Sequence, residues 1–156
     1  MNTIKIKKYS DVIEEMTAQA AIRPGHLVEI NAAGNVQNHS TADGNVLPMF
    51  ALEDELQGRG IDDNYAANAP VQVWVPGRGD VVYAVLADNE NVTRGEWLVS
   101  NGNGELKAKT SFGSQDSFSD VEGGNTIVGQ AIESLDLSDS SGTWPAARRR
   151  IKVRIY

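Results

Sequence analysis

The residues best suited to acid and base chemistry are two glutamates in matching contexts, Glu53 after Ala51-Leu52 and Glu133 after Ala131-Ile132. Two carboxyl groups held about 5 to 9.5 Å apart form the catalytic pair of a glycosidase. The competing interpretation is a repeated carboxylate at a strand end that accepts backbone N–H groups and needs no catalysis. The second interpretation is favoured, so the sequence predicts that the protein is not an enzyme.

Other catalytic and metal-binding residues are scarce. His26 and His39 are the two histidines and the chain has no cysteine, which argues against a His-centred triad, a thiolate site and a three-histidine zinc site. The acidic segment 62–64 lacks the alternating oxygen ligands of a calcium loop. We expect no catalytic residue, no metal and no other cofactor.

The tryptophans are candidates for recognition rather than reaction: Trp74, Trp97 and Trp144. An exposed indole can stack on a sugar ring or anchor a protein interface. Trp74 lies on the strand face opposite Val71 and Val73, so it is predicted to be a surface or trimer contact.

Charge is distributed unevenly along the 156 residues. The chain carries 14 basic and 21 acidic residues, yet residues 1–8 hold three lysines and residues 148–156 hold five basic residues, without an acid in either segment. The middle therefore has a net charge of −15 and should repel nucleic acid and anionic membranes. Segment 148–154 is expected to be the solvated edge of a strand, and no nucleic-acid partner is predicted.

Hydropathy indicates one compact domain that is not inserted in a membrane. The longest apolar run, Val81–Ala87, is far shorter than the roughly 20 residues needed to cross a bilayer. The amino terminus lacks the apolar core of a signal peptide, so the protein is expected to stay where it is made.

An internal duplication organises the chain into pseudo-repeats at about 22–75 and 92–155. A shift of 70 residues aligns Gly25, Asn31 and Gly34 with Gly95, Asn101 and Gly104, and a shift of 80 aligns the later strands. The change of shift places ten extra residues near the Ser/Gly/Asp-rich stretch 110–123, which is predicted to be a surface loop.

Each half is predicted to be built from short strands. Segments 71–75 and 151–155 alternate strictly between β-branched and other residues, which is typical of strands with one buried face. Two halves with unpaired edges should close into one body. The predicted fold class is mostly β, a compact barrel or sandwich with at most one or two short helices. Segment 11–20 fits a short helix and an extended strand about equally well.

The amino-terminal segment Thr3–Lys7 alternates apolar and basic residues and has no counterpart before the second repeat. Such a segment can extend from the body and add as a strand to a partner's sheet, with Ile4 and Ile6 filling pockets. The alternative is a terminal strand that frays or pairs with its own chain.

The motifs 22–28 (IRPGHLV), 33–36 (AGNV), 50–53 (FALE) and 71–75, with their repeats, resemble the capsid decoration proteins of tailed bacteriophages. The resemblance covers roughly residues 17–156. It implies a lambda-type decoration fold, a homotrimer on the outer surface of the expanded capsid, and a bridge between subunits of the major capsid protein. It also implies synthesis in the host cytoplasm and assembly into the virion.

The same resemblance implies that residues 1–16 form a capsid-binding arm and 17–156 the body. The gripping residues of the arm would be Ile4, Lys5, Ile6, Lys7, Lys8 and Tyr9. The alternative function is a carbohydrate-binding or receptor-binding module on a virion surface.

Overall fold

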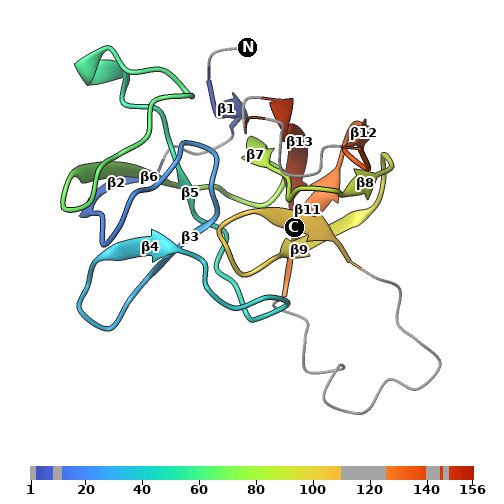
Figure 1. The fold of residues 1–156 in the computed structure, drawn as a ribbon, viewed down its shortest axis with the longest axis horizontal. Helices are drawn as coiled ribbons and strands as arrows, with labels where there is room; N and C mark the ends of the chain where they lie inside the picture. Colours follow the sequence, from blue (N-terminus) through green and yellow to red (C-terminus); the bar gives the residue numbers. More distant parts are fainter. Residues whose placement is uncertain (1–2, 9–11, 110–125, 140–144, 146–147) are drawn as a thin grey trace.

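The computed structural model describes residues 3–8, 12–109, 126–139, 145 and 148–156, and the fold is mostly β, as predicted (Figure 1). The described residues form thirteen strands and one short 3-10 helix, η1 (Glu55–Gln57). The strands are β1 (Lys5–Lys7), β2 (Val12–Thr17), β3 (Val28–Ile30), β4 (Val36–Asn38), β5 (Phe50–Ala51), β6 (Pro70–Val75), β7 (Val81–Val85), β8 (Asn91–Val92), β9 (Trp97–Ser100), β10 (Leu106–Ala108), β11 (Ile127–Ala131), β12 (Leu135–Asp136) and β13 (Arg150–Ile155).

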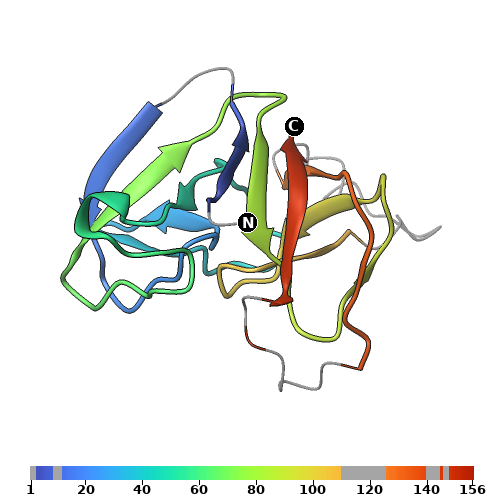
Figure 2. The same ribbon diagram turned by 90° about the horizontal axis from the view of Figure 1, so that it is seen from above.

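The strands form several antiparallel sheets. The largest has six strands in the order β1-β7-β13-β11-β9-β10, and a second has three in the order β2-β6-β5. The remaining pairs are β3-β4 and β12-β8. Figure 2 shows the strands of the first half on one side of the molecule and those of the second half on the other, with β1 beside β7.

Segment 12–17 is a strand, so the helical alternative for this region is wrong. It pairs with β6 along its whole length, from Val12 opposite Val75 to Thr17 opposite Pro70. A full ladder of backbone hydrogen bonds to a distant strand outweighs a weak local helical pattern. The predicted surface loop at 110–123 lies outside the described residues.

The loop that opens each half has the same geometry. Gly25 and Gly95 both adopt positive φ angles, 89° and 96°, a conformation that glycine tolerates without steric cost. Their N–H groups donate to the carbonyls of Ala51 and Ala131, each at 2.8 Å. These glycines are 70 residues apart and these alanines 80, so the spatial repeat reproduces both shifts found in the sequence.

The turn after the first strand of each half is also repeated. The side-chain oxygen of Asn31 accepts the N–H groups two and four residues later, and that of Asn101 does the same. Gly34 and Gly104 follow with φ angles of 80° and 78°. Both turns are therefore closed by an Asx hydrogen bond and a left-handed glycine.

Strand β2 is the counterpart of β7, which the sequence did not reveal. Ala18, just after β2, donates its N–H to the carbonyl of Ala69 at 2.9 Å, and Leu86, just after β7, donates to that of Arg149. Each of these two residues also forms a parallel bridge to the returning strand of its own half, β4 or β10. The repeated unit therefore begins at β2, and the boundary drawn between residues 16 and 17 cuts through a strand.

The core consists of two clusters that meet at β6. The strand sends Val71 and Val73 into a smaller cluster within the first half, while Trp74 on the opposite face enters the larger one. The larger cluster combines Leu27 of the first half with Leu98 and other residues of the second. Because the halves share this cluster, neither one buries its apolar surface alone.

The basic carboxy-terminal strand β13 lies inside the six-stranded sheet, between β7 and β11, so the prediction of a solvated edge is wrong. Arg150 is buried, and its guanidinium donates to Asp62 Oδ1 at 2.8 Å and to the carbonyls of Pro24 and Ile61. A charged side chain can be buried when its donors are satisfied. Arg150 therefore connects the second half to two loops of the first.

Candidate functional site

The amino-terminal segment is docked onto its own body, so the prediction of a free arm is wrong for its described residues. Ile4 is fully buried in the larger cluster, and its carbonyl accepts the N–H of Tyr83 at 2.8 Å. Its own N–H donates to both carboxylate oxygens of Glu53, at 3.1 and 3.3 Å. The segment enters the sheet because β7 offers an open edge and Glu53 an acceptor.

The other predicted arm residues differ in exposure. Lys5 and Ile6 are half-buried, while Lys7 and Lys8 are exposed. Tyr9 lies outside the described residues. Strand β1 is nevertheless an edge of the six-stranded sheet, so its outer side faces away from β7.

Glu53 and Glu133 bind different segments of the chain. Glu133 accepts the backbone N–H of Lys152 at 2.9 Å and contacts its ammonium group at 3.1 Å. Glu53, as described above, accepts the N–H of Ile4. Each carboxylate thus has a structural role in holding a backbone donor, which is the competing interpretation given for the pair.

His39 and Ser100 form a hydrogen-bonded pair that the sequence did not predict. His39 Nδ1 lies 2.8 Å from Ser100 Oγ, and its Nε2 lies 3.1 Å from the carbonyl of Asn45. Both side chains are buried, with Ser100 fully inaccessible. A nucleophilic serine needs access to a substrate, so this pair joins the two halves instead.

His26 lies at the junction of the halves beside Asn38. Its Nδ1 is 3.1 Å from Asn38 Oδ1, and its Nε2 is buried without a hydrogen-bond partner. Burial lowers the pKa of His26 because the charged imidazolium loses hydration; the Asn38 bond opposes this effect. His26 is therefore a packing residue that is kept neutral.

Two tyrosine and tryptophan positions show how burial separates core aromatics from surface ones. Trp74 is fully buried, so its assignment as a surface or trimer contact is wrong. Tyr65 is also buried, which raises the pKa of its hydroxyl to about 12. Trp144 lies outside the described residues.

Trp97 is exposed and belongs to a surface cluster with Tyr156 and Arg78. Its indole is 41% exposed, and its ring meets that of Tyr156 edge to face, with centroids 5.5 Å apart and an interplanar angle of 81°. The Arg78 guanidinium lies 4.7 Å from the Tyr156 ring centroid. Trp, Tyr and Arg are the residues enriched at protein interfaces. Because the rings are nearly perpendicular, they offer no shared flat platform for a sugar.

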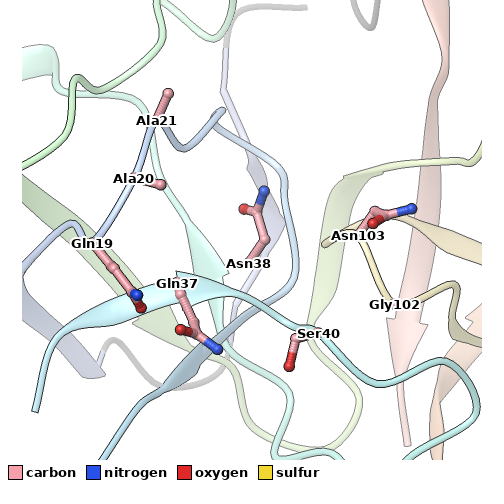
Figure 3. A pocket seen from close by; sticks show the side chains of 8 residues that line it. All are labelled: Gln19, Ala20, Ala21, Gln37, Asn38, Ser40, Gly102 and Asn103. Carbon is pink, nitrogen blue, oxygen red and sulfur yellow. The ribbon is translucent and has the colours of Figure 1, made fainter. Parts of the chain in front are cut away.

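An open polar cleft of about 360 Å³ lies where the halves meet (Figure 3). Its lining consists of Gln19, Ala20, Ala21, Gln37, Asn38, Ser40, Gly102 and Asn103. Several of the side chains are already engaged: Gln19 accepts from Asn31, and Gln37 donates to Glu29. The cleft has hydrogen-bonding groups without a charged or nucleophilic side chain other than a serine hydroxyl.

Within the described ranges, no three or more His, Asp or Glu side chains are grouped so as to hold a metal ion. The described part of the chain also contains no helix long and apolar enough to cross a membrane. The sequence matches no model of a known protein family and no curated protein.

Proposed function

We propose that the protein is a structural virion component that binds the outer surface of an expanded tailed-phage capsid as a trimer and bridges major capsid protein subunits. The observation that carries the proposal is the cationic edge strand β1, with Lys7 and Lys8 exposed beside it. A partner strand can add to this edge, with backbone hydrogen bonds giving affinity. The docked strand replaces the free arm as the contact with the shell.

The energetics of such a role require binding alone. A protein that binds only the expanded shell stabilises it by about 2.7 kcal/mol per site at a free concentration a hundredfold above the dissociation constant. The lysines of β1 would be drawn to acidic patches on the shell, while the acidic remainder of the chain limits contact with the packaged genome.

The proposal is tested by mixing the purified protein with expanded and unexpanded shells and measuring what sediments with each. We expect uptake by expanded shells. We also expect that Lys7→Glu with Lys8→Glu weakens uptake about tenfold or more, equivalent to about 1.4 kcal/mol.

The matched control is Arg59→Glu with Arg148→Glu, which makes the same change in net charge at exposed positions away from β1. Equal loss of binding in both double variants would show a general charge effect and contradict the role of β1. Absence of uptake by either kind of shell would reject the function itself.

The alternative, a carbohydrate-binding module on a virion surface, is favoured by one observation, the exposure of Trp97. Titration with saccharides, followed by tryptophan fluorescence, tests it directly. A saturable change that is lost in Trp97→Ala would support this alternative over capsid binding.

A further inference from the structure

The two halves bind each other through a contact that the chain makes once. On the first half, the segment beginning at Gly25 lies on the outer edge of β7, where the Gly25 carbonyl accepts the N–H of Val85 at 3.0 Å. The approach is close, because a Cβ added at Gly25 would lie 3.0 Å from the carbonyl oxygen of Tyr83. Leu27, two residues later, is fully buried in the shared core. We call this segment of the first half the docking surface and the β7 edge its receptor.

The second half has the same docking surface, but it is exposed. Gly95 is the counterpart of Gly25, and a Cβ added there would have no neighbour within 4 Å. Trp97 stands where the first half has the buried Leu27, and it is 41% exposed. The second half therefore presents, toward solvent, the surface that the first half uses internally.

The first half has a matching receptor that is also exposed. Because β2 corresponds to β7, Thr17 corresponds to Val85, whose N–H is bound by Gly25. Ala18 donates its N–H toward β6, and alternate residues of a strand face opposite ways, so the N–H of Thr17 points away from β6. No described strand pairs with this outer side of β2.

Exposed apolar residues gather on these two surfaces. Val12 and Ile13 of β2 are 49% and 39% exposed. Ile30, the counterpart of the fully buried Ser100, is 52% exposed. Trp97 and its neighbour Tyr156 lie on the opposite surface. Thus five of the seven large exposed apolar residues of the described chain fall on surfaces whose counterparts are covered internally.

Charge also matches between the two surfaces. The receptor strand β2 carries Glu14 and Glu15, both exposed. The docking surface of the second half carries Arg94, next to Gly95, and Arg78, which lies over Tyr156. Opposite charges across an interface set orientation and speed association.

We propose that copies of this chain associate head to tail, with the Gly95–Trp97 segment of one copy docking on the β2 edge of the next. Each contact between copies then repeats the contact between the halves of one copy. Such a heterologous interface closes into a ring when its rotation permits and otherwise forms an open chain. The inference specifies the self-association that is part of the proposed function, and it is tested without any shell.

The test compares the full chain with two blocked variants by sedimentation velocity from about 1 to about 100 µM, a range that reports micromolar interfaces. Trp97→Asp blocks the docking surface, and Ile13→Asp blocks the receptor. We expect the unmodified chain to be oligomeric and each variant to associate about 30-fold more weakly or worse, as for a hot-spot residue. Leu56→Asp is the control, because Leu56 is 89% exposed and lies in η1, outside both surfaces.

Mixing the two variants gives the decisive result. The Trp97→Asp copy keeps its receptor and the Ile13→Asp copy keeps its docking surface, so the mixture should form one-to-one dimers although each variant alone is monomeric. Thr17→Pro provides a second receptor variant, since it removes the outward N–H and leaves the ladder to β6 intact. Urea midpoints establish that the variants are folded.

Three results would overturn the proposal: a monomeric unmodified chain over the whole range, unchanged association of folded Trp97→Asp and Ile13→Asp, or a mixture that stays monomeric. A monomeric chain that still binds expanded shells would reject this interface and leave the proposed function standing. An oligomer disrupted by these variants that binds no shell would do the reverse.

Discussion

Replacement of Ile4 by alanine tests whether the amino-terminal strand belongs to the body in solution. Ile4 is fully buried in the larger core cluster, so Ile4→Ala removes buried apolar atoms and leaves a cavity. Such substitutions cost 2 to 5 kcal/mol, and we expect about 3 kcal/mol here. Ile6, in the same strand, is half-buried, so Ile6→Ala should cost about 1 kcal/mol or less.

The assay is equilibrium unfolding in urea with the denaturant slope measured for each protein. With a slope of about 2 kcal/mol/M, the midpoint should fall by about 1.5 M for Ile4→Ala and by about 0.5 M for Ile6→Ala. Ile6→Ala is the matched control, because an arm detached from the body would make both substitutions nearly silent. Changes below about 0.5 kcal/mol in both variants would refute the docking of β1 and restore the free arm.

Three further predictions concern stability. Gly129→Ala should cost about 1 to 3 kcal/mol, since the added Cβ would lie 2.4 Å from the carbonyl oxygen of Arg154 in the neighbouring strand; urea midpoints measure it, and a neutral result would contradict the close approach of β11 and β13. Gly34→Ala should cost about 1 kcal/mol from its positive φ alone, because its Cβ would meet nothing within 4 Å; a loss as large as at Gly129 would mean that the turn is packed. Burial lowers the folded-state pKa of His26 below 6.5, so the unfolded state binds more protons and stability present above pH 6.5 should fall as the pH decreases toward the folded pKa; midpoints at several pH values should show a smaller decline in His26→Gln, and an equal decline would exclude His26 as the cause.

Local patterns in the sequence were sufficient to predict the β class and the duplication. The repeated glycine and asparagine positions, such as Gly34 with Gly104, mark turns whose backbone geometry depends on residue type alone. The strict alternation at 71–75 predicted which valines face one side of the strand, and Val71 and Val73 are buried together. These features were predictable because they depend on neighbours within a few residues.

The candidate site was predicted less well, because its residues depend on distant partners. Trp74 alternates with valines as a surface residue would, yet it is buried because a second apolar layer from the other half covers that face of β6. Likewise, pairing of His39 with Ser100 joins residues 61 positions apart, which no spacing rule connects.

The sequence by itself determined that this protein is an acidic, duplicated β structure with cationic ends, since composition, periodicity and turn chemistry are local properties. Tertiary structure alone decided where those ends go. Strand β1 binds β7 and Glu53 because the edge and the carboxylate are brought together by folding, and β13 lies inside its sheet for the same reason. It also decided that one docking surface is buried and its copy exposed, because a chain of two halves can satisfy such a contact once within itself.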